Sequence, residues 1–261
     1  MDLAFADILQ WLQAFWWPFC RTLAVFSVAP MIGEAMVPVT VRVLLALPVA
    51  VVMMPISQTS AHVVAPFSLH ALVVTAEQGL IGLGIGLTLH LAMGALTTLG
   101  FLLSSQIGLS MAVLNDPLNG NSSDVITAII NVLCMLAFFG LDGHLLFVSI
   151  LGRSFEAWPV GGGLPLLTLQ GVAYNLGWVF SAAMLLALPV VAGALVVQIG
   201  MGFLNRASPS LNLFSLGYTL ITLMGLYMLS QVLASIPAHY MRMTGQLLDG
   251  LTQGMRAAHG G

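Results

Sequence analysis

Three groups of residues in this sequence have the side chains and spacing that chemistry would need. The first is Asp142-Gly143-His144, in which a carboxylate and an imidazole stand two positions apart. Such a pair could hold a metal or exchange a proton, but a catalytic metal normally takes three protein ligands. No third ligand is identifiable beside the pair, so the sequence predicts no metal site here.

The second group runs from Gly108 to Met111, with sequence Gly-Leu-Ser-Met, and is similar to half of an intramembrane serine-protease motif. A serine nucleophile needs a base within hydrogen-bond reach, and the sequence places no histidine for that purpose. The glycines of residues 82–86 are similar to a nucleotide-binding loop, but they lie inside an apolar run rather than between a strand and a helix. We therefore predict neither an enzyme nor a cofactor.

The third group consists of ionisable side chains within or beside apolar runs. Near the centre of a membrane helix, Arg or Asp costs about 2.5 to 3.5 kcal/mol on translocon scales. We therefore expect these side chains to avoid lipid. They would lie along an ion or substrate path or, as we favour, be buried against a partner or placed at a membrane edge. They are Arg21, Glu34, Arg42, Glu77 and Asp142.

Four small residues and one histidine recur every fourth position in one apolar run, at Gly82, Gly86, His90, Gly94 and Thr98. Residues four apart share one face of a helix, and small side chains let a second helix approach closely. The stripe predicts a helix-packing seam. The alternative is that His90 acts as a proton relay or a ligand.

The composition indicates whether water or an apolar medium surrounds the segments that carry these residues. Of 261 residues, 59% are hydrophobic and 6% are charged, against roughly 25% charged in soluble domains. The six cations are all arginines and are scattered singly, with a net charge of −3. A nucleic-acid partner is not expected, because no basic stripe could neutralise phosphates. The cysteines, Cys20 and Cys134, lie in apolar stretches and behave as small hydrophobes.

Long apolar runs predict an all-α membrane protein of about six helices, since roughly 20 apolar residues span a bilayer. The first run is interpreted as a retained helix, because no cation precedes it as in a signal peptide. The third run, with 35 residues, and the fifth are too long for a simple perpendicular span and must tilt, kink or leave the membrane. Gly94 and Gly100 are candidate kink sites in the third run, and Pro189 is one in the fifth. The runs are about Trp11–Met31, Val39–Ile56, Leu69–Leu103, Val125–Ile150, Gly171–Met201 and Leu211–Ile236.

A polar interval, Ser104 to Asp124, separates the third and fourth runs. Irregular backbone at membrane depth is tolerated only where protein buries it or water lines it. The interval is therefore either an ordinary surface loop or a loop that folds into a pore. Its polar side chains include Gln106, Ser110, Asn115, Asp116, Asn119 and Asn121.

Four motifs, in order over roughly residues 15 to 240, resemble the FliR/SctT family of type III export-gate subunits. The first is the Pro, Arg and Leu-Ala pattern of residues 37–47. The others are residues 106–112 followed by Asp116-Pro117, Gly143-His144 followed by Ser154-Phe155, and residues 205–212. The wording of the motifs favours the flagellar branch, with the injectisome subunit SctT as the alternative.

The resemblance implies a single domain, with a FliP-like part over about residues 11–170, a FliQ-like hairpin over 171–240 and a short tail over 241–261. It implies that the first four helices are FliP-like and the last two FliQ-like. The chain would assemble with FliP-like and FliQ-like subunits in the flagellar basal body of the bacterial inner membrane. The gate would stand largely on the periplasmic side and pass unfolded export substrates.

By the same resemblance the polar interval is a pore plug, with Gln106, Gly108, Met111, Asp116 and Pro117 as its leading residues. Methionine suits a gasket, because its unbranched thioether repacks around varied side chains.

The turn with Arg206 and Pro209 resembles a hairpin tip facing an FlhB-like protein on the cytoplasmic side. A proton-coupled transporter using Glu77, His90 and Asp142 is the competing class. Transporters usually have two equal repeats, which a four-plus-two organisation lacks.

Overall fold

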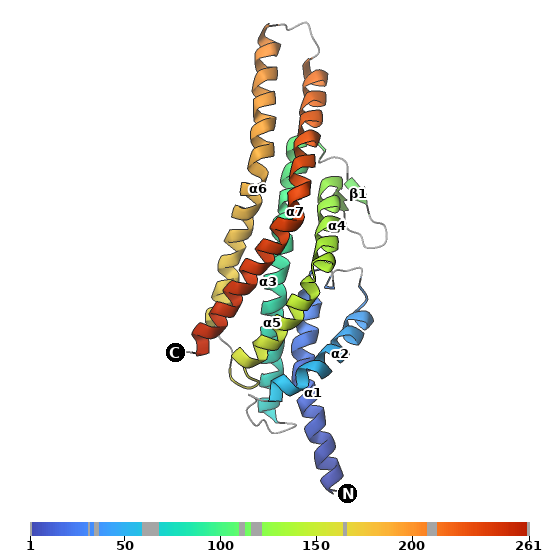
Figure 1. The fold of residues 1–261 in the computed structure, drawn as a ribbon, viewed down its shortest axis with the longest axis vertical. Coiled ribbons are helices and arrows are strands. Elements are labelled where there is room, and N and C mark those ends of the chain that lie inside the picture. Colours follow the sequence, from blue (N-terminus) through green and yellow to red (C-terminus); the bar gives the residue numbers. More distant parts are fainter. Residues whose placement is uncertain are drawn as a thin grey trace. The chain divides into compact units, whose positions relative to one another are not determined.

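Most of the residues that the computed structural model describes are helical (Figure 1). The structure describes residues 2–30, 32–33, 37–58, 68–109, 113–115, 122–163, 166–207 and 213–259. Two short strands, β1 and β2, pair antiparallel within the polar interval. The elements in chain order are α1 Asp2–Val28, α2 Val39–Gln58, α3 Leu69–Ile107, β1 Val113–Asn115, β2 Ser122–Asp124, α4 Val125–Gly140, α5 Gly143–Ala157, α6 Leu166–Ala207 and α7 Leu213–His259.

Among the described residues, four helical segments are long and apolar enough to cross a membrane. They are Val39–Gln58, Leu69–Ile107, Gly177–Ala207 and Gly217–Leu251, and α4 with α5 would make a fifth span if the pair counts as one. Large apolar side chains are exposed on these segments, with Phe203 of α6 70% exposed. The chain is an all-α membrane protein, as predicted, because lipid or other apolar helices must cover such surfaces.

The chain divides into two compact units. One contains Met1–Leu91, Asp142–Leu176 and Thr244–Gly261, and the other contains Ala92–Leu141 and Gly177–Met243. Each of the helices α3, α6 and α7 is therefore divided, with one part in each unit.

In the first unit, α1 packs closely against the first half of α3. A Cβ atom at Gly86 would lie 2.8 Å from the carbonyl oxygen of Val25, so the two backbones almost touch. On another side of α1, Phe26 stacks on Phe147 of α5 with ring centroids 5.6 Å apart. The first unit is thus a set of helices that pack around α1.

In the second unit, α3 runs antiparallel to α4, and α6 runs antiparallel to α7. Gly100 of α3 touches Thr127 of α4, where a Cβ atom would lie 2.6 Å from the Thr127 hydroxyl. Gly193 of α6 is covered by the thioether of Met228 of α7. Glycine in each pair lets one helix approach the other at a distance that a larger side chain would prevent.

The fourth predicted helix is two helices in the structure. The run is interrupted at Leu141 and Asp142, which separate α4 from α5. Asp142 adopts the left-handed conformation, with φ +56°, which Asp and Asn tolerate better than other residues with a Cβ atom. The apolar runs on both sides of Asp142-Gly143-His144 together have about the length of one span, and this hid the break at these polar residues.

In the C-terminal region, α7 continues through Pro237 to His259 and so includes most of residues 241–261. Its apolar side chains recur at intervals of three or four residues, which is the period of a helix with one buried face. That periodicity outweighs the helix-breaking tendency of a single proline. The buried members are Tyr240, Met243, Leu247, Leu248 and Leu251.

Candidate functional site at the end of α3

The helix α3 ends in a glycine turn immediately before the polar interval. Gly108 has φ +84°, in the region that glycine adopts without steric cost. The amide of Leu109 donates a 2.9 Å hydrogen bond to the carbonyl of Ser104, which closes a Schellman-type turn. The direction in which the chain leaves α3 is therefore set by local backbone geometry.

Two hydroxyl groups of α7 complete this helix end. Tyr218 donates a 2.9 Å hydrogen bond to the carbonyl of Gly108, and Thr222 donates a 3.1 Å bond to that of Ile107. The last four carbonyls of a helix have no partner inside the helix, so these donors fill places that water would otherwise take. The Tyr218 ring also lies against Gly108, where a Cβ atom would be 2.8 Å from Cε2.

A third residue of α7 lies on the same face. Gly225 follows Tyr218 by seven residues, or about two turns, and a Cβ atom there would come 3.0 Å from Cγ2 of Ile107. We call Tyr218, Thr222 and Gly225 the α7 clamp. Sequence reasoning missed it, although one signal was available: two hydroxyls and a glycine at positions i, i+4 and i+7 of an apolar helix define a single small, polar face.

The far end of the interval is anchored on α4. In the pairing of β1 with β2, Val113 lies opposite Asp124 and Asn115 lies opposite Ser122. The carboxylate of Asp124 caps α4 by accepting hydrogen bonds from the amide of Thr127 at 2.9 Å and from its hydroxyl at 2.8 Å. Both ends of the interval are thus attached to helices of the second unit.

The structure places part of the predicted plug. Gln106 is half-buried in the last turn of α3, and Gly108 forms the cap. Met111, Asp116 and Pro117 lie outside the described residues. The plug role of these five residues stays a prediction.

The predicted partner-facing turn is described only at its start. Arg206 is exposed in the last turn of α6, and Pro209 lies outside the described residues.

The predicted stripe of small residues approaches another helix in its first half. Gly82 and Gly86 pack on α1, with Gly82 against the carbonyl of Arg21, whereas His90 is exposed and a Cβ atom at Gly94 would meet nothing within 4 Å. Residues four apart are rotated by about 40° per step, because a helical turn takes 3.6 residues. After three steps Gly94 therefore faces a different direction from Gly82.

Arg21 forms a second polar site, in the first unit, and its side chain is fully buried. Its Nε donates to Oε1 of Gln78 at 2.8 Å. Its Nη1 donates to the carbonyl and hydroxyl of Ser154 at 2.7 and 3.1 Å, and its Nη2 donates to the carbonyl of Trp158 at 2.7 Å. The guanidinium also lies 4.0 Å from the ring centroid of Phe155, within cation–π range.

Glu77 supplies negative charge to this arginine network. It is buried, Gln78 donates to its Oε1 at 3.5 Å, and its charge attracts Arg21. The prediction that Arg21 and Glu77 avoid lipid is confirmed, because both side chains are buried within the chain itself. Asp142 is exposed and Arg42 is half-buried, while Glu34 lies outside the described residues.

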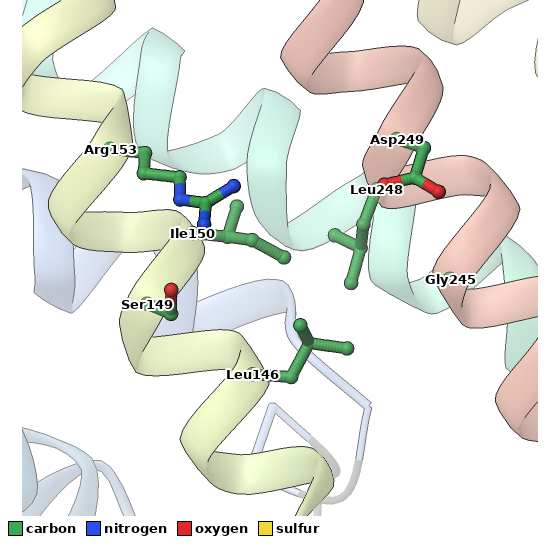
Figure 2. Close-up of a pocket in the computed structure, with 7 residues that line it drawn as sticks. All are labelled: Leu146, Ser149, Ile150, Arg153, Gly245, Leu248 and Asp249. Atoms are coloured by element: carbon green, nitrogen blue, oxygen red, sulfur yellow. The ribbon is translucent and has the colours of Figure 1, made fainter.

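A small cavity of about 70 Å³ lies between α5 and the C-terminal part of α7, both within the first unit (Figure 2). The guanidinium of Arg153 points from α5 toward α7 in this view. Pockets for small molecules usually measure about 300 to 1,000 Å³, so this one does not fit a solute site. The cavity is lined by Leu146, Ser149, Ile150, Arg153, Gly245, Leu248 and Asp249.

Within the described residues, no three His, Cys, Asp or Glu side chains lie close enough to hold a metal ion. His144, like its neighbour Asp142, is exposed. Glu77 is engaged in the arginine network and His90 is exposed, so the structure does not align the groups that the transporter hypothesis requires.

Comparison with known proteins decides the family. Residues 12–247 match the sequence profile of bacterial export proteins, family 1. The chain belongs to this family. The FliR/SctT resemblance is thereby confirmed, and the family identifies the chain as a structural component of a type III export apparatus rather than an enzyme.

Individual relatives of this bacterial export protein agree. It is 33% identical over 230 residues to the flagellar biosynthetic protein FliR of Escherichia coli K12, covering 87% of each chain. It is 30% identical over 245 residues to FliR of Pectobacterium carotovorum, covering 93% of each chain. The Yop proteins translocation protein T of Yersinia pestis is 26% identical over 148 residues, or 56% of this chain and 57% of that protein.

Proposed function

We propose that this chain is a pore-forming subunit of the flagellar type III export gate, and that its polar interval plugs the channel. In this proposal it assembles with FliP-like and FliQ-like subunits and meets an FlhB-like protein at the cytoplasmic side. The gate lies in the bacterial inner membrane at the flagellar basal body, largely on the periplasmic side, and passes unfolded export substrates.

The observation that carries the plug is the double anchoring of the interval. Gly108 and the α7 clamp hold its first end, and Asp124 holds its second end as the cap of α4. An interval fixed at both ends to helices of an apolar bundle stays near those helices, as a plug must. A polar loop at membrane depth also requires water or protein around it, and a channel supplies both.

Exposed apolar faces support the assembly with sibling subunits. Within the second unit, α6 exposes Phe180, Leu185 and Val196, and α7 exposes Leu223 and Tyr227. A helix pair that is apolar on its outer faces must be covered by lipid or by other apolar helices.

The relatives support the flagellar branch over the injectisome branch. Proteins named FliR align over 82 to 93% of this chain, whereas the translocation protein T of Yersinia pestis aligns over 56%.

Shortening the interval tests the plug. Asn115 and Ser122 are paired across the two strands, so Asn-Gly in place of residues 116–121 would join them through a two-residue hairpin turn. We expect this variant to assemble normally and to make the membrane leaky to ions. A control that replaces the same six residues by six Gly and Ser residues separates loop length from loop sequence. Normal assembly without a leak would refute the plug.

Mass measurement tests the assembly. The chain would be expressed with its genomic neighbours, extracted in detergent and weighed. We expect a large hetero-oligomer that contains one copy of this chain. An active monomer or homodimer that carries a small solute would instead support the transporter hypothesis.

A further inference from the structure

We propose that the α7 clamp sets the closed position of the plug, so that opening the gate requires α7 to move away from the end of α3. The clamp is Tyr218, Thr222 and Gly225. This inference rests on the proposed function, and it adds a positioning device and a mechanical coupling between the α6–α7 hairpin and the plug.

The first argument is that the clamp acts at the pivot of the loop. The Schellman-type turn uses the carbonyl of Ser104, whereas the clamp hydroxyls take the carbonyls of Ile107 and Gly108. These are the last helical carbonyl and the first one beyond it. A change in their partners therefore changes the backbone at the point from which the interval starts.

The second argument is that the clamp releases as one body. Its three residues occupy positions i, i+4 and i+7 of one helix, so they share a face. Gly225 contacts the side chain of Ile107, while Tyr218 and Thr222 hold the backbone beside it. A rotation or a slide of α7 breaks all three contacts together, as in helix-shift switches.

The third argument is that the clamp can be opened. The hydroxyl of Tyr218 makes one neutral hydrogen bond, to the carbonyl of Gly108, and its side chain is 52% exposed within the chain, so few contacts hold it in place. The opposite end of the interval is held by Asp124 on α4 and has no clamp residue among its hydrogen-bond partners. Movement of α7 would thus free one end of the interval and leave the other in place.

Removing the two hydroxyls tests the clamp with little change in shape. Tyr218→Phe keeps the ring against Gly108, and Thr222→Val keeps the size of the side chain. We expect the double variant to assemble at normal mass and to raise the ion leak at least threefold, up to the level of the shortened interval. Tyr227→Phe, on the same helix and 63% exposed, and Thr222→Ser, which retains a hydroxyl, are matched controls that should stay tight.

The outcomes separate the two proposals. If the double variant shows no ion leak while the variant with the shortened interval does leak, the clamp proposal is wrong and the plug proposal is retained. A tight shortened interval that assembles normally would overturn the plug, and the clamp with it.

A reversible cross-link provides a test that does not depend on loosening the fold. A Cβ atom at Gly225 would lie 3.1 Å from Cβ of Ile107, slightly closer than the roughly 3.5 to 4.5 Å that the Cβ atoms of a disulfide usually span, so a small outward shift of α7 would let Ile107→Cys bond with Gly225→Cys. We expect oxidation to reduce export to background and a reductant to restore it, with each single variant unaffected by either reagent. Export at the unmodified rate through a cross-linked gate would overturn the proposal.

Discussion

The arginine network of the first unit and the α7 clamp of the second unit solve the same problem by different means. In both, side chains of one helix donate to the carbonyls at the C-terminal end of another. Arg21 serves the end of α5 at Ser154 and Trp158, and Tyr218 serves the end of α3. The arginine is cationic, multidentate and fully buried, whereas the tyrosine is neutral and half-exposed.

This difference separates a permanent joint from a releasable one. A cation at a helix C-terminus gains from the helix dipole, and charged hydrogen bonds are roughly twice as strong as neutral ones. Arg21 cannot leave its site without stranding two carbonyls and the buried Glu77. Tyr218 makes a single neutral hydrogen bond, so its departure leaves only the carbonyl of Gly108 without this donor. The comparison therefore predicts large effects from changes in the arginine network and modest, functionally visible effects from changes in the α7 clamp.

The largest effect is expected from Arg21→Met. It removes the buried cation near Glu77, and breaking a buried charge pair from one side costs about 3 to 5 kcal/mol. We expect the protein to lose most of its assembled complex, measured as yield after detergent extraction. Arg21→Lys should recover only part of it, since one ammonium cannot reproduce the fork of bonds to Gln78, Ser154 and Trp158. Normal yield for the methionine variant would show that the network is not a permanent joint.

Arg21 also shows how far sequence reasoning reaches. Its burial followed from the cost of exposing a charge to lipid, but its partners Gln78 and Ser154 lie 57 and 133 residues away, and only tertiary structure pairs them. Apolar runs located most of the helices, because a long hydrophobic stretch indicates a helix that crosses a membrane. The break at Asp142 was missed, because the hydropathy pattern does not report a backbone conformation such as the left-handed one of Asp142.

The sequence predicted the polar interval of the candidate site but not the α7 clamp that supports it. Polar residues between apolar helices are visible in the sequence. Tyr218 and Thr222, by contrast, stand in a run of apolar residues, where a hydroxyl has little effect on the hydropathy pattern. Their role depends on the contact between α7 and the end of α3, which only the tertiary structure shows.

A smaller effect is expected from Gly108→Ala. A Cβ atom at φ +84° costs about 1 to 2 kcal/mol, and here it also meets the ring of Tyr218. Gly163→Ala is a matched control, because Gly163 has φ +89° and open space around its Cβ position. The thermal midpoint of the complex should fall further for the Gly108 variant, and that variant should also leak. Equal shifts without a leak would mean that contact with Tyr218 adds nothing.

Asp124→Ala should weaken the other anchor of the interval by about 1 kcal/mol, the usual value of a helix N-cap. The loss follows from the two hydrogen bonds that its carboxylate accepts from Thr127. Hydrogen exchange in the first turn of α4 measures the effect locally. Asp124→Asn retains an oxygen acceptor and should preserve most of the protection. Unchanged exchange in the alanine variant would contradict the capping role.

The smallest effect is expected from Asp142→Gly, which separates capping from backbone conformation. Asp142 occupies the same N-cap position on α5 that Asp124 occupies on α4, but its side chain makes no capping hydrogen bond and its φ is +56°. Glycine relieves the left-handed strain and adds freedom to the unfolded chain, and these contributions oppose each other within about 1 kcal/mol. We therefore expect an almost unchanged thermal midpoint for this variant. A loss as large as that of Asp124→Ala would mean that Asp142 stabilises the start of α5 through its side chain.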